Sequence, residues 1–144
     1  KAFACYLFTV PGVPLLYNGQ EADLDKRLKF FERDPIEWKE TELTPFYTKL
    51  VHLRTSHPAL RHGTEGGSYD VLRTTQKNVV AYKRVKGENE VLTILNMSKQ
   101  PVTVALKDGA TAGTYKDLFT GNDVEIAQGS KMQMEPWGYM VLVK

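Results

Sequence analysis

Polar side chains follow directly on a short apolar run near the start of the chain. The run, Val13–Tyr17, is framed by Pro11-Gly12 and Asn18-Gly19, and Gln20 and Glu21 come next. An apolar run bounded by turn residues is typical of a buried strand. In a barrel of parallel strands, polar residues just past the C-terminal end of a strand lie on the face where active sites are built. We therefore expect the first residues to be the last piece of a catalytic barrel, so that the chain begins in the middle of a larger enzyme.

Carboxylates are the next candidates for chemistry. Glu21, Asp23 and Asp25 lie close together and give a local negative charge. Hydrolysis of a glycosidic bond needs two carboxyl groups that flank a bound sugar. Three acids on one loop do not supply that arrangement. We interpret them as a solvated cluster, or one that orders the loop.

The sequence has no motif for metal binding, phosphate binding or nucleophilic catalysis. His52, His57 and His62 are not spaced as a metal triad, and His52 and His57 are five apart, which places them on different sides of a helix. The chain has no Gly-rich phosphate loop and no Gly-x-Ser-x-Gly elbow. The single cysteine, Cys5, excludes an intrachain disulfide and a multi-cysteine metal site, and is interpreted as a small buried residue. We expect this chain to hold neither a metal nor a cofactor.

The composition and the charge of the chain exclude some classes of binding partner. The chain has 144 residues, 42% of them hydrophobic, which is ordinary for a globular chain with a real core. The net charge is +2 without a block of Lys or Arg, so nucleic acid and anionic membrane are not expected partners. The apolar stretch at the start is broken by proline and glycine, so it is not expected to span a membrane.

One helix is predicted at residues 45–57, after a long polar connection at 18–43. The connection carries alternating charges, and four of its residues are interpreted as apolar anchors, namely Phe30, Phe31, Ile36 and Trp38. Thr44 and Pro45 form an N-cap and a first helical position. The helix is expected to end near His57, because Pro58 disfavours a helical residue before it. Its apolar stripe is predicted to face the barrel; the stripe consists of Phe46, Leu50 and Leu53.

From about Leu60 the hydrophobic period changes to two. Short, evenly spaced strands of this kind predict an antiparallel sandwich, here with Greek-key connections. We assign 1–59 to a barrel remnant with strand 13–17, and 60–144 to an all-β C-terminal domain whose own core includes Leu95, Val104 and Val141. The predicted strands are 69–74, 79–85, 90–96, 102–106, 114–118, 131–134 and 138–143.

These segments, taken in order, resemble the alpha-amylase family of glycoside hydrolases. The stretch PGVPLLYNGQE is similar to the family's last barrel strand, RDPIEW to the stretch that often follows, and LTPFYTKLVHLRTSHPAL to the final barrel helix. GTYKDLFTGNDVEI and MEPWGYMVLVK resemble its C-terminal antiparallel domain. The residues that match the strand motif are Gly12, Pro14, Leu16, Tyr17, Gly19 and Glu21.

The resemblance implies the C-terminal portion of a retaining enzyme that acts on alpha-glucans. The family's three catalytic carboxylates lie on earlier barrel strands, and their motifs do not occur here, so the chain by itself is expected to be inactive. The loop after the last strand often lines outer sugar subsites with an Asp and an Arg. By position these are Asp25 and Arg27, with Gln20 and Glu21 nearer the barrel mouth.

Two interpretations of the β domain remain. It is either a carbohydrate-binding module, which needs exposed coplanar aromatics, or a structural element that packs against the barrel and stabilises it. The exposure of Tyr115, Trp137 and Tyr139 distinguishes them. The unpaired strand 13–17 is also expected to be disordered, re-paired or covered by a second copy of the chain, because its backbone groups lack neighbours.

Overall fold

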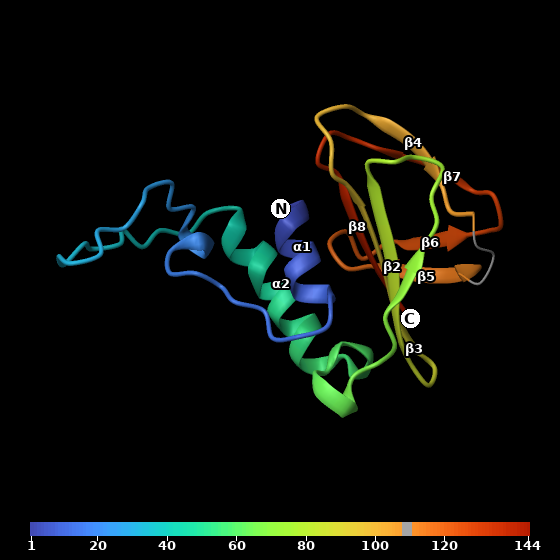
Figure 1. The fold of residues 1–144 in the computed structure, drawn as a ribbon, viewed down its shortest axis with the longest axis horizontal. Coiled ribbons are helices and arrows are strands. Elements are labelled where there is room, and N and C mark those ends of the chain that lie inside the picture. The colour runs from blue at the N-terminus through green and yellow to red at the C-terminus, as the bar shows by residue number, and fades with distance from the viewer. Residues whose placement is uncertain (108–110) are drawn as a thin grey trace.

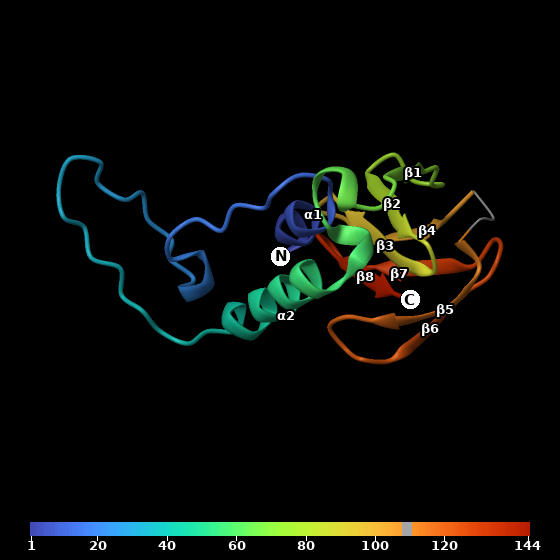
Figure 2. The ribbon, with the colours of Figure 1, turned by 90° about the horizontal axis from the view of Figure 1, so that it is seen from below.

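Two α-helices lie against one side of a β-sandwich (Figures 1 and 2). The computed structural model describes residues 1–107 and 111–144. Helix α1 spans Ala2–Thr9 and helix α2 spans Leu43–Ser56. The short 3-10 helices η1, η2 and η3 span Gln20–Ala22, Pro58–Leu60 and Gly63–Glu65.

The predicted antiparallel sandwich is confirmed. Within the described ranges, the strands form one six-stranded sheet in the order β1-β2-β3-β8-β5-β6 and one two-stranded sheet of β4 and β7. Each strand predicted after Leu60 is present to within a few residues, and β6 was missed. The strands are β1 Asp70–Leu72, β2 Val79–Lys86, β3 Asn89–Asn96, β4 Val102–Ala105, β5 Gly113–Asp117, β6 Asp123–Ile126, β7 Lys131–Met134 and β8 Tyr139–Val143.

Strand β3 is buried on both faces, which a one-sided alternation does not predict. Leu92 and Ile94 point into the core between the two sheets, and Val91 and Leu95 point into a second core on the other face. Strand β8 divides in the same way, with Leu142 in the first core and Val141 in the second. The large sheet is therefore the middle layer of three.

The second core corrects the prediction of an independent β-domain core. Val104 does lie between the sheets, but Leu95 and Val141 pack in one cluster with helix residues. The apolar stripe of α2 belongs to that cluster and so faces α1 and the sheet. The helix residues of the cluster are Ala4, Cys5, Phe8, Phe46, Leu50 and Leu53. The sheet offers this stripe an apolar surface within the chain, and burial against it removes both surfaces from water.

The predicted buried strand at Val13–Tyr17 does not form in this structure. The segment has no strand partner among the described residues, and Val13 and Leu15 are 78% and 73% exposed. A strand of a parallel sheet needs neighbours on both edges. The described chain supplies none, so the segment runs over the surface as an extended connection.

Helix α2 begins two residues before the predicted position, and its predicted end is confirmed. Thr41 takes the capping role, because its Oγ1 accepts the Leu43 N–H at 3.1 Å, while Thr44 Oγ1 accepts the Thr41 N–H at 3.2 Å. The helix ends at Ser56, and His57 is extended before Pro58.

Candidate functional site

The turn that carries Gln20 and Glu21 is built by two residues with positive φ. Gly19 has φ +88° and Asp23 has φ +56°, and they flank η1 at either end. A Cβ on Gly19 would lie 2.9 Å from the Leu24 side chain, so the turn needs glycine there for space as well as for conformation. The structure thus brings Gln20 and Glu21 together in one tight turn.

Gln20 is exposed and holds this turn closed. Its Oε1 accepts the Tyr17 N–H at 2.8 Å, while the Gln20 N–H is donated to the Tyr17 carbonyl at 3.0 Å. Its side-chain amide nitrogen makes no hydrogen bond within the described residues. Gln20 therefore presents an amide donor at the surface from a fixed backbone position.

Glu21 is turned toward α2. Its backbone carbonyl accepts from Thr41 Oγ1 at 3.3 Å and from Thr44 Oγ1 at 3.1 Å, which ties the turn to the start of the helix. Its carboxylate oxygen Oε2 is buried without a hydrogen-bond partner in the described residues. Burial, followed by this nearby negative charge, raises the pKa of Tyr47. Glu21 is thus built into the helix junction.

Asp25 and Arg27 lie on a protruding arm, residues 23–40, that extends away from the body of the molecule (Figure 2). Both side chains are exposed. The arm is held by Asp34, which accepts from Lys26 Nζ at 2.6 Å and from the Lys29 N–H at 3.0 Å. Hydrogen bonding from Lys26 lowers the pKa of Asp34. The four predicted site residues therefore divide between the turn and the arm.

Sequence reasoning missed the tip of the arm. Phe30 and Phe31 are 90% and 94% exposed, with ring centroids 4.8 Å apart and ring planes at 77°. They do not anchor the loop, and neither does Trp38, which is 61% exposed. The signal available in the sequence was two adjacent aromatics between charged residues, a pattern that suits an exposed tip better than a core.

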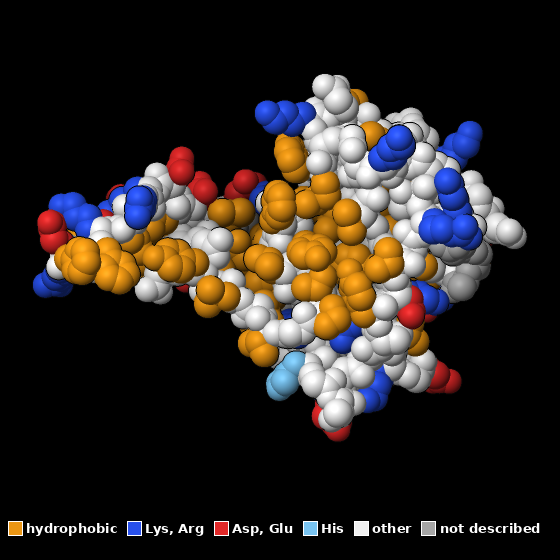
Figure 3. Space-filling view, viewed as in Figure 1, with side chains coloured by type: hydrophobic (Ala, Val, Ile, Leu, Met, Phe, Trp, Pro, Cys, Tyr) orange, Lys and Arg blue, Asp and Glu red, His pale blue; other side chains and the backbone are white. Residues whose placement is uncertain are grey.

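A broad apolar area occupies one side of the molecule, over the helices and the adjoining edge of the sheet (Figure 3). We define the apolar face by five side chains that are between 38% and 78% exposed. Two neighbouring hollows connect them, because the segment 13–16 lines both. The five are Phe3, Leu7, Val13, Leu15 and Val51.

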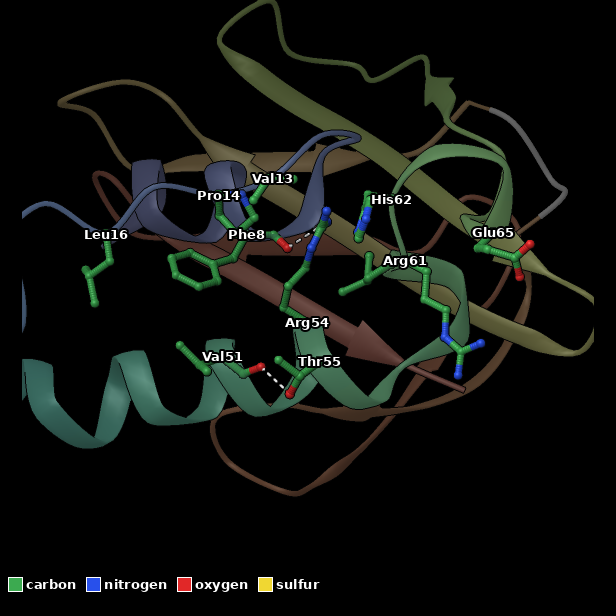
Figure 4. Close-up of a pocket in the computed structure, with 11 residues that line it drawn as sticks. Phe8, Val13, Pro14, Leu16, Val51, Arg54, Thr55, Arg61, His62 and Glu65 are labelled. Carbon is green, nitrogen blue, oxygen red and sulfur yellow. Dashed lines mark hydrogen bonds between the residues drawn. The ribbon is translucent and has the colours of Figure 1, made fainter.

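The larger hollow has a volume of about 640 Å³ and lies between α1, α2 and the segment 13–16 (Figure 4). Phe8, Pro14, Leu16 and Val51 give it apolar walls, and Arg54 rises through it from α2 toward the end of α1. Polar side chains, among them Arg61, His62 and Glu65, line the hollow beside η2 and η3, so its apolar part is the stretch along α1, α2 and the segment 13–16.

The histidines and the cysteine do not form a reactive site. Within residues 1–107 and 111–144, no three His, Cys, Asp or Glu side chains are grouped to hold a metal ion. Cys5 is fully buried, and burial raises the pKa of its thiol to about 12, so it is not a nucleophile at neutral pH. None of the helices in these residues is long and apolar enough to cross a membrane.

His57 has a structural role, and its burial predicts a dependence of stability on pH. Its Nε2–H donates to the Lys144 carbonyl at 3.2 Å, while Nδ1 is buried without a partner in the described chain. Burial lowers the pKa of His57 below its ordinary value of 6.5. Below that pH the unfolded chain binds a proton that the folded chain resists, so stability should fall as pH drops from about 7.5 to 5.5.

Urea midpoints measured across that pH range test this prediction. We expect the pH dependence to persist in His52→Gln, where an exposed histidine is removed, and to diminish in His57→Gln. If the pH dependence of the urea midpoint persists in His57→Gln and disappears in His52→Gln, the prediction is wrong and His52 is its source.

The aromatics of the β domain do not form a sugar-stacking platform. Tyr115 is buried, and its hydroxyl donates to Glu90 Oε1 at 2.7 Å. Tyr139 packs edge-on against Phe46 and Phe119 at 5.6 and 5.1 Å. Trp137 is 41% exposed but tilted by 34° against Phe3, with ring centroids 6.1 Å apart. These contacts favour the structural interpretation of the domain.

Residues 69–141, about half of the chain, match the family described as the maltogenic amylase C-terminal domain. The chain therefore belongs to this family of C-terminal domains, within the alpha-amylase family of glycoside hydrolases. The resemblance predicted from the motifs is confirmed. The prediction that the chain is the C-terminal portion of such an enzyme is also confirmed, because the matched family is a family of C-terminal domains.

Individual relatives support the same assignment. Alpha-amylase MalA of Haloarcula japonica is 36% identical over 84% of this chain and 18% of its own length. Neopullulanase 2 of Thermoactinomyces vulgaris is 30% identical over 95% of this chain and 24% of its own length. A solved structure of the maltogenic alpha-amylase AmyB of Thermotoga neapolitana superposes with a TM-score of 0.82, at 26% identity, over 99% of this chain and 35% of that one. The chain spans about a fifth of the length of the curated relatives it matches.

Proposed function

We propose that this chain is the C-terminal portion of an enzyme that acts on alpha-glucans. Its residues 1–59 join the catalytic barrel through the apolar face, and its β domain packs against that barrel and stabilises it. The observation that carries the proposal is the apolar face itself. Its side chains are exposed along both helices and the segment 13–16. By contrast, the apolar side chains of β3 are fully buried. A contiguous exposed apolar area of this kind marks an interface. The relatives, which are named as amylases, are about five times longer than the region matched.

The segment 13–17 has the pattern of a strand that is covered on both sides. Val13 and Leu15 are mostly exposed and Pro14 and Leu16 are half-buried, and each of the four lines one of the two hollows. Apolar residues on both faces are typical of a strand in a parallel sheet. We propose that this segment completes the barrel and that Gln20, Glu21, Asp25 and Arg27 line its sugar-binding mouth. The domain division at residues 59 and 60 is part of the same proposal.

The chain by itself is expected to release no reducing sugar from maltooligosaccharides. Glycoside hydrolysis needs a pair of carboxyl groups at the bond that is broken, and the family's three catalytic motifs do not occur in this sequence. The assay compares the purified chain with a buffer blank and with a Glu21→Gln variant prepared in parallel. Hydrolysis by the chain that Glu21→Gln abolishes would contradict the proposal.

The apolar face should also make the isolated chain self-associate, as a dimer or larger species. Leu15→Glu places a charge in the centre of the face and should shift the chain toward the monomer in sedimentation experiments. The matched control is Val71→Glu, because Val71 is 69% exposed on β1, outside the apolar face. Equal behaviour of the two variants would mean that the face is not an interface.

A further inference from the structure

One side chain of α2 reaches across to the end of α1. Arg54 Nη1 donates to the carbonyls of Val10 at 3.0 Å and Phe8 at 3.4 Å, and Nη2 donates to the Gly12 carbonyl. Figure 4 shows the side chain rising from α2 to that point. A single guanidinium therefore holds the last turn of α1 and the connection that leaves it.

The chemistry of this contact favours arginine. The last carbonyls of a helix lack partners within the helix and carry partial negative charge. A guanidinium is planar and presents several donors in a fixed geometry, whereas a lysine ammonium is a single point on a flexible stem. Gly12 has φ +109°, so its carbonyl is directed by a turn that depends on glycine. Arg54 thus donates hydrogen bonds both to the end of α1 and to the turn at Gly12.

A second arginine holds the same helix end from the sheet. Arg84 is buried, and its Nη1 donates to the Thr9 carbonyl at 3.4 Å. The Thr9 and Tyr82 hydroxyls share a hydrogen bond of 2.6 Å. These contacts stop at Thr9. Among the side chains of the described residues, the bonds to the Val10 and Gly12 carbonyls come from Arg54.

We propose that Arg54 is a positioning residue that sets the path of residues 10–17 and, through them, the place of the turn that carries Gln20. Only one part of this role rests on the proposed function, namely that the segment belongs to the barrel and its sugar-binding mouth. The order of the segment is a property of this chain and is tested without any substrate.

Hydrogen exchange of the amides tests the proposal in the variant Arg54→Lys, with Arg61→Lys as a matched control. Arg61 lines the same hollow, but its side chain is exposed. The reporters are two hydrogen-bonded amides, Val10 N–H to the Tyr6 carbonyl and Tyr17 N–H to Gln20 Oε1. A lysine ammonium is a single nitrogen and cannot replace both the Nη1 contact to Val10 and the Nη2 contact to Gly12, so exchange should speed up by about tenfold or more in Arg54→Lys. Arg61→Lys should leave them unchanged.

Strand β3 supplies the readout that distinguishes positioning from general stabilisation. Its Val91 and Leu95 amides should keep their protection in Arg54→Lys. Unchanged exchange at Val10 and Tyr17 would overturn the proposal, and so would an equal increase at all four amides. In the complete enzyme, Arg54→Lys should raise the KM for maltotetraose more than it lowers kcat. Faster exchange at Val10 and Tyr17 with an unaltered KM would keep the positioning role and overturn the proposed sugar-binding role of the segment.

Discussion

Leu50→Ala is expected to lower the free energy of unfolding by about 2–5 kcal/mol. Leu50 is fully buried in the cluster that joins both helices to the sheet, together with Leu95 and Val141. Truncating it removes apolar contacts and leaves a cavity that the surrounding residues fill only in part. Leu95→Ala should cost a similar amount, because both side chains belong to one core.

Urea unfolding of the two variants, beside Val51→Ala, measures this. Val51 follows Leu50 on the same helix but is 38% exposed, so its truncation should cost clearly less. A loss for Leu95→Ala without a comparable loss for Leu50→Ala would mean that α2 is not part of the folded core in solution.

Arg84→Met should cost about 3 kcal/mol of stability. Arg84 is 1% exposed, and its acceptors within the described chain are backbone carbonyls, with Nε donating to Ser68 at 2.8 Å and Nη2 to Gly67 at 3.2 Å. Burial lowers the pKa of the guanidinium. Methionine keeps the apolar stem but leaves those carbonyls without a donor, in a place where water has little access.

Lys86→Met is the control for this variant. Lys86 lies on the same strand, and its Nζ donates to the Glu65 carbonyl at 3.0 Å, but its side chain is exposed. Removing the same charge there should change stability by no more than about 0.5 kcal/mol. Similar losses in both variants would show that net charge, and not the buried hydrogen bonds of Arg84, determines the effect.

Local patterns predicted the elements of this fold well and their partners poorly. The period-two pattern after Leu60 located the strands to within a few residues, and Pro58 located the end of α2, because both follow from backbone and side-chain periodicity. β6 was missed although Asp123–Ile126 carries the same period of two, with Val124 and Ile126 between charged residues. The periodicity of the sequence does not indicate which surface the apolar stripe of α2 will cover.

The candidate site shows the same limit. The turn residues Asn18 and Gly19 indicated a turn after Tyr17, and the structure has one there, in which Gly19 adopts a positive φ. The sequence did not indicate that Glu21 is attached to α2 through Thr41 and Thr44, since those contacts span twenty residues or more. Nor did it show that Arg54 reaches the end of α1, 42 to 46 residues away.

The membership of the second core has a consequence for how the chain is made. Cys5 and Phe8 lie near the beginning of the chain, and Val141, which packs in the same cluster, lies near its end. Because α1 and α2 precede β8 in the chain, part of their apolar surface is expected to stay uncovered during synthesis until β8 pairs with β3 and completes the cluster. Non-local contacts of this kind form slowly, and exposed apolar surface invites association in the meantime. A chain that stops before β8 would keep Val91 and Leu95 of β3 for the helices to pack on but would lack Val141, so the cluster would stay open on that side.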